Sequence, residues 1–194
     1  VQTCALPISM HNVRHLWTSV RPNGDNRPHD LNRIELRICD LIADPLELLA
    51  VTAFAELRLL QLLADPPGSD PALASGLSVG ELAALADAND RAAARSSLEA
   101  ELVHWRTGAP IQARDWIAGA LESMGPLATD LGFGGLLAPL EMLLTRGNTA
   151  MRWLALQRAG QPVASIVAAD ATALEEREMA LQACLVTDPA HALG

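Results

Sequence analysis

The sequence predicts an α+β protein in which two antiparallel strands precede a mainly α-helical C-terminal region. Within residues 32–40, Ile34, Leu36 and Ile38 alternate with polar residues, and period-two alternation is typical of a half-buried strand. After Asp40 the apolar spacing changes to about 3.6 residues. Ala and Leu dominate there, and aromatic residues make up only 3% of the chain, so most of it should be helix.

A first strand is expected just before this one. The run from Leu16 to Val20 contains strand-forming residues and is stopped by Pro22. Asn23-Gly24 is a turn signal, and the connection to the second strand is too long for a tight hairpin. We therefore expect two antiparallel strands joined by a loop.

Helix signals follow along the rest of the chain. Asp44 before Pro45 predicts an N-cap with proline at the first helical position, and Ser78 with Glu81 predicts a capping box. The predicted helices cover residues 45–63, 78–105, 111–123, 136–145, 149–159 and 162–183. The first should pack on the apolar face of the sheet through the stripe Leu46, Leu49, Ala50, Ala53, Leu57 and Leu60.

Proline and glycine between residues 65 and 77 predict a linker. The linker would separate residues 9–64, the sheet with its packing helix, from a helical region at residues 78–194. Residues 1–8 are similar to the translation of a common sequencing adapter, so we exclude them from the fold. On this interpretation the native N-terminal part is missing and the chain is a fragment.

Charge and composition exclude some classes of function. The net charge of −9 argues against a nucleic-acid partner, because phosphate contacts need a basic surface. No apolar run reaches the roughly 20 residues of a membrane span. Three widely spaced cysteines fit a reduced, cytoplasmic protein better than a disulfide scaffold. We therefore expect no nucleic acid and no membrane among the partners, while the oligomeric state does not follow from the sequence.

The polar face of the second strand is the candidate site. Arg33, Glu35 and Arg37 lie on that face, at a spacing of roughly 6.5–7 Å between successive side chains. Arg21 has the matching position on the first strand. This spacing suits a metal beside a phosphate. It equally suits solvated pairs on the wet face of an antiparallel sheet, and spacing alone favours that simpler interpretation.

A longer sequence pattern favours a binding site on this face over solvated pairs. Residues 12–25 read Asn-Val-Arg-His-Leu-Trp-Thr-Ser-Val-Arg-Pro-Asn-Gly-Asp, and residues 31–41 read Leu-Asn-Arg-Ile-Glu-Leu-Arg-Ile-Cys-Asp-Leu, followed by Asp44-Pro45. These runs closely resemble the second half of the glutamate-cysteine ligases of the cyanobacterial and related proteobacterial type, within the carboxylate-amine ligase group. The resemblance continues more loosely through residues 44–63 and 146–153.

The resemblance implies ATP-dependent joining of the glutamate γ-carboxylate to cysteine, the first step of glutathione biosynthesis, on a curved sheet like that of glutamine synthetase. It implies glutamate, cysteine and ATP as substrates and Mg²⁺ as cofactor. By position, Glu35 matches the magnesium ligand, Arg37 the contact to the transferred phosphate, and Arg21 a contact to a phosphate or a substrate carboxylate. Such transfer needs charge compensation from metal-held phosphates and arginine.

Two other functions stay open at this point. The chain could belong to a ligase that uses another amine, or it could be a non-catalytic helical interaction module in which Glu35 and Arg37 are surface pairs. One carboxylate does not build a multi-magnesium site. We therefore expect this chain alone to be an inactive fragment.

Overall fold

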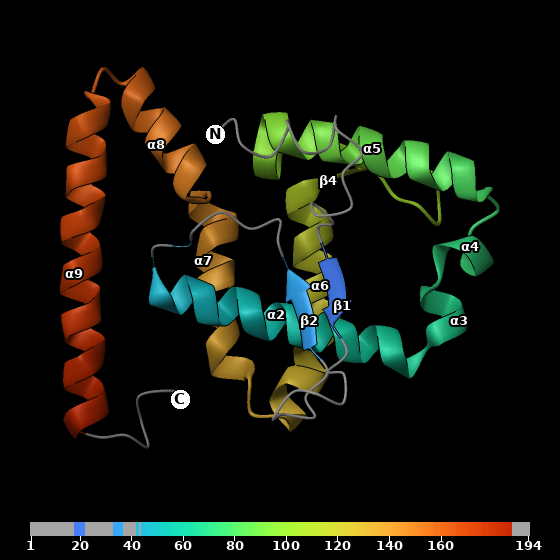
Figure 1. The fold of residues 1–194 in the computed structure, drawn as a ribbon, viewed down its shortest axis with the longest axis horizontal. Coiled ribbons are helices and arrows are strands. Elements are labelled where there is room, and N and C mark those ends of the chain that lie inside the picture. The colour runs from blue at the N-terminus through green and yellow to red at the C-terminus, as the bar shows by residue number, and fades with distance from the viewer. Residues whose placement is uncertain (1–17, 22–32, 37–41, 43, 188–194) are drawn as a thin grey trace. The chain divides into compact units, whose positions relative to one another are not determined.

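The computed structural model describes residues 18–21, 33–36, 42 and 44–187, and the chain divides into two compact units, residues 1–42 and residues 43–194 (Figure 1). In the first unit, strands β1 (Thr18–Arg21) and β2 (Arg33–Leu36) pair antiparallel. The described part of the second unit is mostly helical. The predicted α+β class, with two antiparallel strands before a helical region, is confirmed.

The second unit contains a second small sheet among its helices. Its elements are α2 (Pro45–Ala64), α3 (Pro66–Ser69), α4 (Pro71–Ala74), α5 (Val79–Ser96), the 3₁₀ turn η2 (Ser97–Glu99), β3 (Glu101–Val103), β4 (Pro110–Gln112), α6 (Ala113–Asp130), the 3₁₀ turn η3 (Gly134–Leu137), α7 (Ala138–Arg146), α8 (Thr149–Arg158) and α9 (Val163–Thr187).

Helix α2 begins as predicted. The Asp44 side chain accepts a hydrogen bond from the Leu46 amide at 2.9 Å, and Pro45 fills the first helical position. Only part of the predicted apolar stripe is buried. Ala50, Ala53 and Leu57 are buried, whereas Leu46, Leu49 and Leu60 are 41%, 38% and 37% exposed.

The hydrophobic core of this unit forms around α2. Its buried members are Ala50, Ala53 and Leu57 of α2, Met124 and Ala128 of α6, Leu137 of η3 and Leu140 of α7. Ala50 and Ala53 have small side chains, so α6, η3 and α7 can approach α2 closely. The core contacts of α2 shown by the structure are with other elements of the helical unit.

Helix α5 starts at the predicted capping box but ends nine residues before the predicted end. Ser78 and Glu81 exchange both hydrogen bonds of the box. The helix stops at Ser96, and Ser97 takes a positive φ of 52°. The prediction of helix from 78 to 105 is therefore wrong at its C-terminal end, where β3 follows.

Strands β3 and β4 form a hairpin that the sequence reading missed. His104 and Ala109 close its loop through an amide-to-carbonyl bond of 2.9 Å, and Gly108 takes a φ of +68° that favours glycine. The Asn89 side chain of α5 pairs with the edge of β3. It accepts from the Val103 amide and donates to the Val103 carbonyl, both at 2.9 Å. The Asn89 side-chain amide thus bonds the backbone N–H and C=O of the β3 edge, as a neighbouring strand would.

Helix α6 crosses the break predicted at Gly125-Pro126. It runs on to Asp130, although Pro126 removes one backbone hydrogen bond and costs about 3 kcal/mol in a helix interior. Met124 and Ala128, on either side of the proline, are buried in the core. Their burial requires the helix to continue, which offsets the local cost.

The last three helices follow the prediction closely. Gly147, with a φ of +84°, ends α7, and the Asn148 side chain caps α8 by accepting from the Met151 amide at 2.9 Å. Helices α8 and α9 pack on each other (Figure 1). None of the helices in the described ranges is long and apolar enough to cross a membrane.

The segment predicted as a linker carries the short helices α3 and α4. Asp65 caps the first by accepting from the Gly68 amide at 3.1 Å, and Asp70 caps the second by accepting from the Ala72 amide at 2.9 Å. Each aspartate is followed by proline at the first helical position. The division into residues 9–64 and 78–194 stays a prediction.

The two hydrogen bonds between the Asn89 side chain and the Val103 backbone, here called the Asn89 clamp, can be tested by removing the side chain. Asn89→Ala should lower the free energy of unfolding by about 1–2 kcal/mol, because the Val103 amide and carbonyl lose their partners. Urea denaturation of the chain measures this. Arg95→Ala on an exposed position of the same helix should change stability by less than about 0.5 kcal/mol. Equal stability of Asn89→Ala and the wild type would contradict a structural role of the clamp.

Candidate functional site

The strand ladder of the first unit brings the predicted polar positions together. Ser19 pairs with Glu35 and Arg21 pairs with Arg33. Directly opposite residues of an antiparallel pair share one face, as do alternate residues of one strand. Positions 19, 21, 33 and 35 therefore lie on one face of the ladder, and positions 18, 20, 34 and 36 on the other.

Two of the three predicted site residues fall in described strands. Arg21 ends β1 and Glu35 lies near the end of β2, at diagonal positions of the same face. The sequence placed them on one face, and the register agrees. Arg37 lies outside the described residues. Its role and those of Arg21 and Glu35 stay predictions.

A magnesium ion requires more than this hairpin supplies. Magnesium prefers octahedral oxygen coordination and is usually held by one or two carboxylates with waters and substrate phosphates. Among the described positions of the ladder face, Glu35 is the single carboxylate. No group of three or more His, Cys, Asp or Glu residues that could hold a metal occurs in the part of the chain described. Glu35 thus fits as one ligand of a larger set, and the described residues do not form that set.

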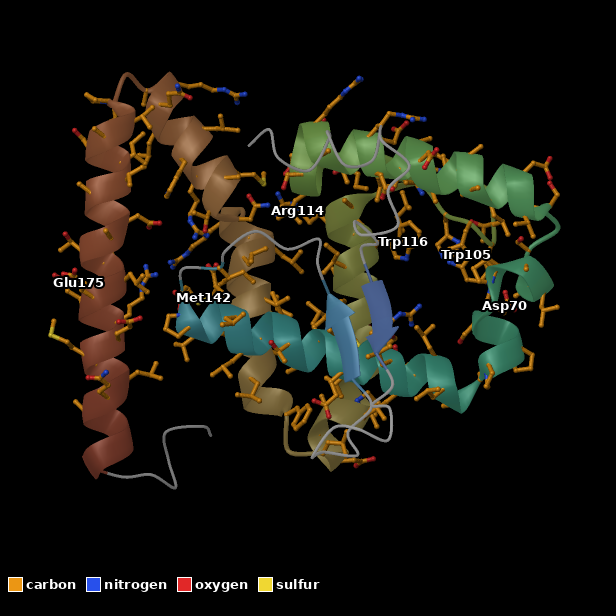
Figure 2. The ribbon with its side chains drawn as sticks, in the orientation of Figure 1. Asp70, Trp105, Arg114, Trp116, Met142 and Glu175 are labelled. Carbon is orange, nitrogen blue, oxygen red and sulfur yellow. The ribbon has the colours of Figure 1, made fainter. Side chains whose placement is uncertain are left out.

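The helical unit holds an aromatic column at the β3–β4 loop. The His104 ring lies 5.8 Å from the Trp105 ring and 4.9 Å from the Trp116 ring, and the Arg106 guanidinium lies 4.9 Å from the centroid of Trp105. The two tryptophans are labelled in Figure 2. The Arg106 amide donates to His104 Nδ1 at 3.2 Å, and its side chain donates to the Gly68 carbonyl. The column connects the hairpin to α3 and α6, which is a structural role.

A second polar cluster lies at the start of α2. Arg152 of α8 donates to Glu47 at 3.3 Å, and Arg177 of α9 donates to the N-cap Asp44 at 2.8 Å. The sequence reading missed both pairs. Partners separated by 105 and 133 residues leave no local signal in the sequence.

Comparison with known proteins identifies the family. The sequence model of glutamate-cysteine ligase family 2 matches residues 3–175, which is most of the chain. The chain belongs to glutamate-cysteine ligase family 2. The predicted resemblance is therefore confirmed, and the match includes both the β1–β2 ladder and most of the helical unit.

A curated relative of this family member comes from Gloeobacter violaceus and is described as "Putative glutamate--cysteine ligase 2". The two sequences are 28% identical over 161 residues, which is 82% of this chain and 40% of the relative. The chain thus spans about two fifths of the relative's length. No solved structure gives a significant match to the chain.

Two carboxylates of this family 2 chain have shifted pKa values, and both lie on α5. Hydrogen bonds from the side chain and amide of Ser78 lower the pKa of Glu81. Burial raises the pKa of Asp90 above its ordinary 3.8, the charge of Asp87 raises it further, and Arg91 opposes the shift. A raised carboxylate pKa can mark a functional site. Here no metal-binding group occurs among the described residues, and burial is the largest cause of the raised Asp90 pKa.

The pKa of Asp90 predicts how stability depends on pH. The folded state binds the Asp90 proton more tightly than the unfolded state, so the free energy of unfolding falls as pH rises from the ordinary value of 3.8 through the raised pKa. Asp90→Asn should therefore be more stable than the wild type at pH 7. The difference should shrink as the pH falls below 3.8.

Urea denaturation at pH 7 and at acidic pH measures this difference. Asp87→Asn is the matched control: it removes a secondary cause of the shift and should stabilise the chain less. Destabilisation by Asp90→Asn at pH 7 would show that the ionised carboxylate makes a favourable contact, contrary to the prediction.

Proposed function

We propose that this chain is part of an ATP-dependent ligase that joins the γ-carboxylate of glutamate to the amine of cysteine. The product would be γ-glutamylcysteine, the first intermediate of glutathione biosynthesis. The family match over residues 3–175 carries this proposal. The ladder register supports it, because it groups positions 21, 33 and 35 on one face.

The roles proposed for the hairpin follow from charge. Glu35 would be one ligand of Mg²⁺, and magnesium, when bound, neutralises charge on the phosphate oxygens. Arg37 would contact the transferred phosphoryl group, for which a planar and always charged guanidinium is suited. Arg21 would hold a phosphate or a substrate carboxylate. Short strands hold such groups more rigidly than loops do.

The chain alone should be inactive. The described residues of the hairpin provide one carboxylate for a metal that needs several ligands, and the chain spans 40% of its relative's length. The remaining ligands and the cysteine pocket would then come from other parts of a longer protein. We infer that Glu35, Arg37 and Arg21 form one wall of the site.

The roles of the hairpin can be tested in the full-length protein from the intact gene. Glu35→Gln and Arg37→Ala should each lower kcat/KM for γ-glutamylcysteine formation by about 100-fold or more, because each removes a charge facing the transferred phosphate. Product formation is measured with glutamate, cysteine and Mg-ATP. Arg91→Ala, on the exposed surface of α5, is the control and should keep wild-type activity.

Two results would each contradict one part of the proposal: the first would contradict the inactivity of the chain alone, and the second the ligase function. Product made by the purified chain alone, and lost in Glu35→Gln, would show that the chain holds a complete site. Unchanged binding of Mg-ATP by full-length Arg37→Ala would favour the alternative in which the chain is a non-catalytic helical module.

The identity of the amine can be tested separately. Phosphate release by the full-length protein, measured with glutamate, ATP and a series of amines, should give a kcat/KM for cysteine at least about tenfold above those for serine and alanine. A larger kcat/KM for another amine would retain the carboxylate-amine ligase chemistry and replace cysteine as the substrate.

A further inference from the structure

The strand register of the hairpin places a neutral polar residue directly opposite Glu35. Ser19 of β1 pairs with Glu35 of β2, and both positions belong to the ladder face that includes positions 21 and 33. Directly opposite residues of an antiparallel pair have Cβ atoms about 4.5–5.5 Å apart. Among the described positions of this face, position 19 is therefore the nearest to position 35.

The two arginine positions of this face lie farther from Glu35. Arg33 is two residues away along β2, which corresponds to about 6.5–7 Å. Arg21 has a diagonal position, for which roughly 7–8 Å is typical. An arginine that paired with the carboxylate would compete with a metal for its charge, whereas a neutral donor leaves that charge available.

A hydroxyl is suited to hold a carboxylate that binds a metal. A serine hydroxyl can donate one hydrogen bond, and an ionised carboxylate can only accept. One carboxylate oxygen can accept from the hydroxyl while the other binds the metal. Metal-ligating carboxylates are commonly held by such hydrogen bonds, and loss of the donor typically lowers metal affinity or activity by about 10–100-fold.

We propose that Ser19 is a positioning residue that orients Glu35 as a magnesium ligand, an inference that rests on the ligase function proposed above. The register carries this proposal, because it pairs the two positions directly. In this role Ser19 acts through the Glu35 carboxylate and contacts no substrate. The effect of losing Ser19 therefore depends on the presence of Glu35.

Two substitutions of nearly equal shape separate the hydroxyl from the strand. Ser19→Thr keeps a hydroxyl, whereas Ser19→Val has a methyl group in its place, and both new residues are β-branched and favour strands. A purely structural role of position 19 predicts the same result for both. Thr18→Val is the matched control, because it removes a hydroxyl from the opposite face of the same strand.

The experiment measures Mn²⁺ binding to the full-length protein by electron paramagnetic resonance, with Mn²⁺ in place of Mg²⁺. The relevant ion is the one whose binding is lost in Glu35→Gln. Ser19→Val should raise the dissociation constant of this ion at least about tenfold, while Ser19→Thr should stay within about threefold of the wild type. Thr18→Val should match the wild type. In the Glu35→Gln background, Ser19→Val should cause no further loss of binding.

Ligase activity of the full-length protein gives a second measurement. The half-saturating concentration of free Mg²⁺ for γ-glutamylcysteine formation should rise in Ser19→Val by the same factor as the Mn²⁺ dissociation constant. Ser19→Thr should recover most of this loss, because its hydroxyl can still donate to the carboxylate.

The outcomes separate this role from the proposed function. Equal Mn²⁺ binding by Ser19→Val and Ser19→Thr would overturn the positioning role alone, as would a further loss in the Glu35→Gln background. A wild-type protein that binds this ion but forms no γ-glutamylcysteine would overturn the ligase function, and the Thr and Val variants would still decide the role of Ser19. Unchanged Mn²⁺ binding in Glu35→Gln would overturn the metal role of Glu35 and, with it, that of Ser19.

Discussion

Close packing against α2 is the constraint on which the rest of the helical unit depends. Ala50 and Leu57 have no exposed surface, and Met124 of α6 is equally buried against them. A larger side chain at Ala50 would have to displace neighbours in a core packed like a crystal. Because α6, η3 and α7 all pack against this helix, one core joins segments that lie between residues 45 and 146.

Side-chain hydrogen bonds to the backbone connect the parts that the core does not reach. Asn89 completes the edge of β3, Asn148 caps α8 and donates to Ser97 at 2.6 Å, and Arg152 takes up the Gly147 carbonyl. These contacts satisfy backbone groups or hold corners where the chain changes direction. Polar groups left unpaired in such places would cost more than a typical hydrogen bond contributes.

The chain belongs to glutamate-cysteine ligase family 2, so its architecture can be related to a ligase. The hairpin β1–β2 groups its charged positions on one face, and the helical unit has a packed core of its own. In our proposal the hairpin contributes part of the phosphate-binding site.

Local interactions could be predicted from the sequence. The Asp44 cap, the capping box at Ser78 and the stop at Gly147 depend on neighbours within four residues, and each was predicted. The shared face of Arg21 and Glu35 followed from strand alternation, which has a fixed period. Chemical roles did not follow from that period, and they rested on the family resemblance.

Only the tertiary structure decided the features that depend on distant partners. Helix α6 passes through Pro126 because its flanking residues are buried, and the β3–β4 hairpin replaces the predicted end of α5 where Asn89 pairs with its edge. The pair of Arg152 with Glu47 joins residues 105 positions apart. The sequence by itself determined where elements begin and which positions share a face, since these depend on neighbouring residues. Burial and long-range hydrogen bonds decided the rest, because their energies arise only when distant segments meet.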